Sequence, residues 1–391
     1  MPIVFVHGVN TRKGAKYEKE VRNRNAMFRH LVLSQLVDDS SSACIMNPYW
    51  GDAGATLRWN HASLPQSAAR AFGRSERLED VLLGEVATTL PPRPGQSVLV
   101  IARESFSRAI DVLFAVAVDL ASDGSAGGVV ELWTSANDYA TRNPRPDWLD
   151  SVRNDAEFFA RLSREIEDRQ PDAATAQAFG PREVWQRVRE AMNRIAHSFS
   201  NVGSDLLLVS TRRRLHATVS LFLGDVFVYL QQRGDKGQPG PIVQCIIDAL
   251  VKATEAISDV DSKLIVVAHS MGGNIVYDVL SHFRQDLTCD ALVTVGSQVA
   301  LFEELKLFKL RDLSVPRDPA ADRMPKPDNI RHWLNVYDTN DVLSFAASGV
   351  FEDVTDIDYV TGKGVLSAHG TYFQRPSFHS LLGERLEEVL Q

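Results

Sequence analysis

Residues 263–274 read KLIVVAHSMGGN, and this stretch restricts the fold of the chain more than any other. The apolar run from Ile265 to Ala268 is typical of a buried strand, and it ends on a serine among small residues. The form small-x-Ser-x-small, here Ala268 to Gly272, is that of a turn that holds a serine in a strained backbone between a strand and a helix. The stretch therefore predicts a strand, a tight turn with Ser270 as a candidate nucleophile, and a helix.

The simpler interpretation of the same letters is a glycine-rich turn with no chemical role. The preceding strand and the helical pattern from Ile275 to Phe283 favour the nucleophile instead. A second Ala-His-Ser occurs at 196–198, but it has no glycine after it and no strand before it. We therefore take only Ser270 as the candidate nucleophile.

Other apolar runs predict further buried strands with amphipathic helices between them. Strands are expected at 3–6, within 43–50, at 264–268, within 290–297 and within 332–338. Helical spacing of apolar residues is found between 17 and 36, between 243 and 257, and from 275 to 283. Because the strand runs are continuous rather than alternating, we expect an α/β fold with a mostly parallel sheet of about six strands or slightly more, covered by helices on both faces.

The middle of the chain does not follow this alternation. Breakers at 91–95, 122–128 and 142–147 separate helical patterns, so we expect residues 53–220 to form a mostly helical insertion. The catalytic core would then consist of residues 1–52 and 221–391. Because loops beyond the carboxyl ends of parallel strands face the site, the insertion is expected to form a cap over Ser270.

Two features of the insertion have a functional and a plain interpretation. One is an apolar stripe at helical spacing, made of Phe106, Ile110, Leu113, Phe114 and Ala117. It either lines a pocket for an acyl chain or forms the core of the insertion. The three arginines at 212–214 either meet a phosphate group or an acidic partner, or form a solvated face.

Composition excludes several classes of protein. A net charge of −8 argues against a general nucleic-acid binder. The three cysteines, Cys44, Cys245 and Cys289, form neither a CxxC nor a zinc pattern, which favours a reducing compartment, and we expect a cytoplasmic protein without a metal or a cofactor. The N-terminal stretch MPIVFVHG does not have the pattern of a signal peptide. No apolar run approaches the roughly 18 to 20 residues that a membrane span needs, so we expect at most peripheral contact with a membrane.

A serine nucleophile needs a base and an orienting acid, and on this type of turn they follow it along the chain as acid and then histidine. Of the four histidines after Ser270, His282 lies in a predicted helix, His332 opens a strand and His379 begins the last helix. His369, in the loop SAHGTYF, is therefore the candidate base. The candidate acids are Asp341 and Asp338, just past the strand within 332–338.

Ester hydrolysis also needs donors for an oxyanion. The N–H of Met271, the residue after the nucleophile, is one candidate. The second is the N–H of Val9 in the loop FVHGVN, where Gly8 allows the backbone to turn inward after the first strand. The alternative is that His7 and Gly8 form an ordinary turn.

The segments VHGVN, VVAHSMGGN, TVGSQ, NVYDTNDVLS and SAHGTYF resemble the α/β-hydrolase superfamily, in its lipase/esterase-like branch. The resemblance covers residues 1–52 and about 220–391, not the insertion. It departs from the family at the start, which corresponds to the family's third strand, and at Ala268, where the family usually has glycine. The family's Asp-x-Val pattern matches Asp341 before Val342, so we favour Asp341 over Asp338.

The resemblance implies a serine hydrolase that cleaves a small-molecule or lipid ester through an acyl-enzyme, with Ser270, His369 and Asp341 as the triad. A thioesterase or peptidase with the same triad is one alternative. A non-catalytic binding or assembly module on a hydrolase fold is another. The sequence does not indicate which residues bind the substrate.

Overall fold

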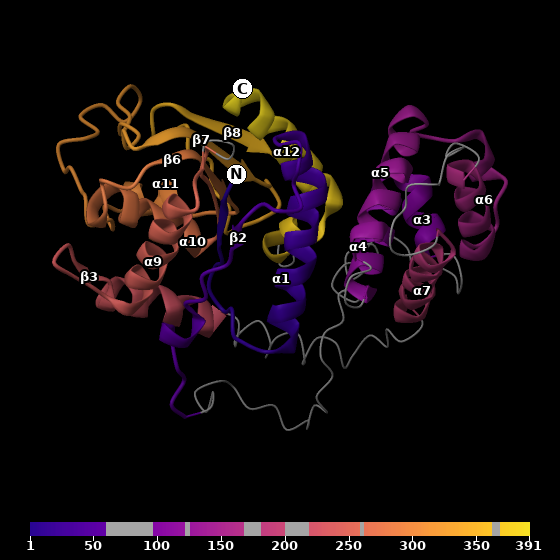
Figure 1. Cartoon of the computed structure of the whole chain (residues 1–391), viewed down its shortest axis with the longest axis horizontal. Coiled ribbons are helices and arrows are strands. Elements are labelled where there is room, and N and C mark those ends of the chain that lie inside the picture. Colours follow the sequence, from indigo (N-terminus) through magenta and orange to yellow (C-terminus); the bar gives the residue numbers. More distant parts are fainter. Residues whose placement is uncertain (60–96, 122–125, 168–180, 200–218, 259–261, 362–367) are drawn as a thin grey trace.

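The computed structural model describes residues 1–59, 97–121, 126–167, 181–199, 219–258, 262–361 and 368–391 (Figure 1). Its centre is one sheet of six strands in the order β2-β1-β5-β6-β7-β8, all of them parallel. The strands are β1 (Ile3–Val6), β2 (Ile45–Met46), β5 (Ile265–His269), β6 (Cys289–Val295), β7 (Ile330–Tyr337) and β8 (Val354–Asp358). The expected α/β class and the parallel sheet of about six strands are thereby confirmed.

Helices cover both faces of the sheet. Successive residues of each strand point to opposite faces, so the apolar strands place side chains on both faces that need to be buried. On one face lie α1 (Ala15–Met27), its continuation through the turns Phe28–Val32 and Leu33–Gln35, and α12 (Pro376–Leu390). On the other lie α9 (Pro241–Glu255), α10 (Met271–Asp278), its continuation Val279–Phe283, and α11 (Val299–Glu304). Val266 and Ala268 of β5 face the second group, whereas Ile265 and Val267 face the first.

β1 and β5 are neighbours in the sheet, although the whole insertion separates them in sequence. The chain leaves β1 for α1 on one face and leaves β5 for α10 on the other. Loops that diverge in this way open a crevice at the carboxyl ends of the two strands, which is where parallel α/β sheets bind ligands. The topology therefore brings the loop after β1 next to Ser270.

The described part of residues 53–220 is mainly helical, with α3 (Ser97–Glu104), α4 (Phe106–Leu120), α5 (Ala126–Arg142), α6 (Asp155–Glu167) and α7 (Pro181–Phe199). These helices share a hydrophobic core, to which Met27 of α1 and Leu31 of its continuation also belong, and they lie beside α1 and α12 (Figure 1). Lys19 of α1 pairs with Asp119, and Arg375 before α12 pairs with Asp111. This bundle therefore adds a helical layer outside α1 and α12, and a cap over Ser270 is not confirmed in the described residues.

The apolar stripe of α4 has the plain explanation. Its members are at most 1% exposed and belong to the bundle core: Phe106, Ile110, Leu113, Phe114 and Ala117. Of the two interpretations of the stripe, the described residues therefore favour the core of the insertion. The arginines at 212–214 lie outside the described residues.

Residues 219–232 are helical and return the chain to the core, where Tyr229 is fully buried. A short hairpin of β3 (Gly234–Asp235) and β4 (Gln238–Pro239) then leads to α9. Among the described helices, none combines the length and the apolar character that crossing a membrane requires.

Candidate active site

Ser270 stands in the turn between β5 and α10, with φ 54° and ψ −129°. A positive φ is uncommon for a residue with a side chain, and it marks a locally strained backbone. The Ser270 N–H donates to the Val295 carbonyl at 2.9 Å, so the end of β6 holds the turn in place. The expected strand, strained turn and helix are all present.

The glycines after Ser270 are required by close approach. A Cβ on Gly272 would lie 2.5 Å from the Val6 carbonyl oxygen, and one on Gly273 would lie 2.3 Å from Ser297 Oγ. The nearest neighbour of Gly272 is thus the end of β1, so the small residue lets α10 start against that strand. The Ser297 hydroxyl also donates to the Ser270 carbonyl at 3.0 Å.

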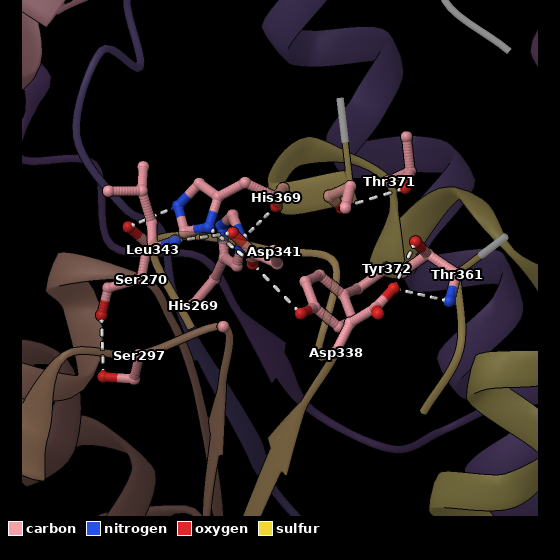
Figure 2. A network of polar contacts seen from close by, with 12 residues as sticks. His269, Ser270, Ser297, Asp338, Asp341, Leu343, Thr361, His369, Thr371 and Tyr372 are labelled. Atoms are coloured by element: carbon pink, nitrogen blue, oxygen red, sulfur yellow. Dashed lines mark hydrogen bonds and ion pairs between the residues drawn. The ribbon is translucent and has the colours of Figure 1, made fainter. Parts of the chain in front are cut away.

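Three side chains from distant parts of the chain meet at this turn (Figure 2). His369 Nε2 lies 2.8 Å from Ser270 Oγ, and His369 Nδ1 lies 2.9 Å from Asp341 Oδ2. A carboxylate only accepts, so in the neutral ring Nδ1 carries the proton and Nε2 accepts from the Ser270 hydroxyl. The arrangement is that of a nucleophile, a base and an orienting acid.

The two candidate acids have different partners. Asp341 also accepts from the Leu343 N–H and the Tyr372 hydroxyl, both at 3.0 Å (Figure 2). Asp338 instead accepts from the Thr361 N–H at 2.8 Å and from its hydroxyl at 2.6 Å. The structure therefore places Asp341 beside His369 and Asp338 in a separate network.

Tyr372 and His269 are site residues that the sequence analysis missed. Burial raises the pKa of Tyr372, and the negative charge of Asp341 raises it further, so the phenol stays protonated and donates. His269 Nε2 lies 2.8 Å from the carbonyl of His369 and must donate to it. Burial, together with the nearby His369, lowers the pKa of His269 to about 3, so its ring is neutral near pH 7.

The other three histidines that follow Ser270 in the sequence lie in a helix or a strand. His282 lies in the continuation of α10 and His332 in β7. His379 is buried in α12, where Nδ1 lies 3.0 Å from the Arg375 carbonyl, and burial lowers its pKa to about 4. Among the four candidates after Ser270, His369 is the one that contacts the serine hydroxyl in the described structure.

The loop after β1 touches Ser270. A Cβ on Gly8 would lie 2.7 Å from Ser270 Cβ and 3.2 Å from Ser270 Oγ, so only glycine allows this approach. The N–H of Met271 lies at the start of α10, where an N–H has no partner one helical turn earlier. Both stretches of backbone proposed to hold an oxyanion thus adjoin Ser270.

His7 orients the peptide between Gly8 and Val9. The Trp50 N–H donates to His7 Nε2 at 3.2 Å, so Nδ1 carries the proton and donates to the Gly8 carbonyl at 2.8 Å. Burial lowers the pKa of His7 to about 4, which keeps the ring neutral. The Gly8 C=O and the Val9 N–H belong to the same trans peptide, in which they point in opposite directions. Because the Gly8 oxygen points toward the His7 ring, the Val9 N–H points away from that ring.

A scan against protein-family models gave no match, and neither did a search of curated proteins. Within the described residues, no three His, Cys, Asp or Glu side chains gather closely enough to hold a metal ion. The function is therefore inferred from the geometry around Ser270.

Proposed function

We propose that the chain is a serine hydrolase that cleaves an ester through an acyl-enzyme intermediate. The observation that carries the proposal is the continuous relay from Ser270 Oγ through His369 to Asp341, at 2.8 and 2.9 Å. A hydroxyl is a weak nucleophile by itself, and an adjacent base held by an acid is what activates it. The strained turn and the start of α10 supply the rest of the setting expected for such a nucleophile.

In the first half of the reaction, Ser270 Oγ attacks the ester carbonyl carbon while His369 Nε2 takes the hydroxyl proton. The oxyanion that forms accepts hydrogen bonds from the Met271 and Val9 N–H groups. Collapse of this intermediate breaks the bond to the alkoxy oxygen, which leaves as an alcohol with the proton from His369. The acyl group is then bonded to Ser270.

In the second half, water attacks the acyl carbon and gives a proton to His369. The second intermediate expels Ser270 Oγ, which recovers that proton, and the carboxylic acid is released. Asp341 holds the tautomer of His369 and stabilises its positive charge.

Labelling with a fluorophosphonate followed by mass spectrometry tests the nucleophile. We expect a single adduct on Ser270, loss of the adduct and of ester hydrolysis in Ser270→Ala, and an unchanged circular dichroism spectrum. Ser198→Ala is the matched control, because Ser198 has the same Ala-His-Ser context but lies in α7. An adduct on another serine, or none, would overturn the proposal and leave a binding module as the alternative.

The class of bond is tested by comparing matched ester, thioester and peptide probes with the same acyl group. The proposal expects the ester to give the highest kcat/KM. A higher value for the thioester or the peptide would reassign the chain to a thioesterase or a peptidase with the same triad. Loss of all three activities in Ser270→Ala shows that one site performs them.

A further inference from the structure

Asp225 is a buried carboxylate in an otherwise uncharged helix. Residues 219–232 read VSLFLGDVFVYLQQ, and the Asp225 side chain is 0% exposed. Burying a carboxylate costs free energy unless hydrogen-bond donors compensate the charge. The donors around Asp225 therefore indicate its structural role.

Three segments converge on Asp225. Its Oδ2 accepts from the Asn10 N–H at 2.8 Å, and its Oδ1 accepts from the Ala55 N–H at 2.6 Å. Arg12 spans both oxygens, with Nη2 at 2.8 Å from Oδ1 and Nη1 at 3.2 Å from Oδ2. Asn10 and Arg12 belong to the loop between β1 and α1, and Ala55 follows β2. The carboxylate therefore joins that loop to a helix more than 200 residues away.

Two separate sets of contacts hold the peptides that flank Val9, and Asp225 belongs to one of them. On one side, the Gly8 carbonyl accepts from His7 Nδ1 at 2.8 Å and from Thr11 Oγ1 at 3.1 Å. On the other, Asn10 has φ 57°, and its N–H points to Asp225. With the planes before and after Val9 both fixed, the direction of the Val9 N–H is set before any substrate binds. Donors fixed in advance are the ones that stabilise a developing oxyanion best.

We propose that Asp225 is a positioning residue that holds the oxyanion loop, so that the Val9 N–H points at the site of the developing charge. The inference rests on the proposed hydrolase function. Asp225 does not touch the reacting atoms; it acts through Asn10 and Arg12. Its loss should therefore slow the chemical step more than it weakens substrate binding.

Asp278 offers a matched control. It is also a fully buried carboxylate tied to the same helix, and it accepts from the Tyr229 hydroxyl at 2.6 Å, from Arg233 Nη1 at 2.7 Å and from the Lys309 N–H at 2.8 Å. None of these partners belongs to the loop between β1 and α1. Replacing Asp278 disrupts a buried clamp of the same kind and leaves the loop alone.

The experiment compares Asp225→Asn with Asp278→Asn in the full chain, using a p-nitrophenyl ester and fluorophosphonate labelling. We expect both variants to lower the melting temperature. Asp225→Asn should also lower kcat by about 10-fold to 100-fold, since removing one oxyanion donor outright costs about 10²- to 10³-fold. Its KM should change by less than about threefold, and Asp278→Asn should keep kcat within about twofold of the wild type.

The outcomes separate the two proposals. If the wild type is not labelled at Ser270, the hydrolase function itself fails. If the wild type is labelled, an unchanged kcat in Asp225→Asn, a change in KM alone, or an equal loss in Asp278→Asn overturns the role of Asp225. Should Asp225→Asn not fold, Arg12→Lys replaces it, because lysine cannot span both carboxylate oxygens, and an unchanged kcat there overturns the role too.

Discussion

At the scale of single residues, Asp338 and Asp341 show how environment separates two similar side chains. Both are buried at the carboxyl end of β7. Asp341 receives the His369 ring and the Tyr372 hydroxyl on the same oxygen, whereas Asp338 ties the Thr361 segment to the end of the strand. Asp341 therefore contacts the His369 ring, and Asp338 binds the chain that follows β8.

Replacing these carboxylates by amides tests that division. Asp341→Asn should reduce kcat on the order of 10⁴-fold, because an amide at that position favours the wrong tautomer of His369. Asp338→Asn loses a buried acceptor and should mainly reduce stability. Steady-state kinetics at a temperature where both variants stay folded measures the difference, and a reversed ranking would contradict the geometry.

At the scale of elements, the turn between β5 and α10 depends on how closely the helix approaches β1. Gly272→Ala would set a Cβ 2.5 Å from the Val6 carbonyl, and neither backbone segment can move without disturbing the sheet. We expect the free energy of unfolding to fall by about 1–3 kcal/mol, the usual cost of overpacking. Urea unfolding measures this change.

Gly349→Ala is the comparison for that substitution. A Cβ at Gly349 meets nothing within 4 Å, so this variant should unfold at nearly the same urea concentration as the wild type. Equal stability of the two variants would show that the contact at Gly272 relaxes without cost.

The helical bundle illustrates a limit of pattern reading at the same scale. The apolar stripe along α4 is buried, as the spacing predicts, but Val112, Ala115, Val116 and Val118 outside the stripe are buried as well. The spacing does not specify the surface that buries the stripe. In the described residues the stripe lies in a core that the bundle helices share with Met27 and Leu31, and ion pairs from Lys19 and Arg375 join α4 to α1 and to the start of α12.

At the scale of the whole molecule, the buried His7 and His379 and the half-buried His269 are neutral in the folded chain and couple stability to pH. Burial lowers the pKa of His7 and His379 to about 4 and that of His269 to about 3, from 6.5 in an exposed histidine. Below pH 6.5 the unfolded chain binds protons that the folded chain does not. The stability contribution of neutral burial is therefore complete above pH 6.5 and is lost as pH falls toward 4.

We expect the free energy of unfolding to decrease between pH 6.5 and 4, with each histidine adding up to about 1.4 kcal/mol per pH unit to the slope. His379→Asn should reduce the slope, because it removes one titrating group while its amide can still donate to the Arg375 carbonyl. Urea unfolding at several pH values measures both. A slope identical to that of the wild type would show that His379 is not a source of the dependence.

The sequence by itself determined the features that are encoded locally. Apolar runs specified five of the six strands, and for the four inner strands the reason is that a strand covered on both faces must be apolar throughout. The small residues around Ser270 and the chain order of acid and histidine were enough to single out Ser270 and His369 and to limit the acid to Asp341 or Asp338, of which the family resemblance favoured Asp341. β8 was missed because most of it is only half-buried at the sheet edge, so its residues carry no such run.

Tertiary structure alone decided the features that depend on distant partners. Asp225 reads as one charge in an apolar helix, and its donors at Asn10 and Ala55 lie 215 and 170 residues away. His269 and Tyr372 become site residues only when the loop bearing His369 folds over β5. The position of the bundle is likewise set by packing between whole surfaces. The spacing of apolar residues indicates which of them are buried, and only the folded chain determines which other residues they contact.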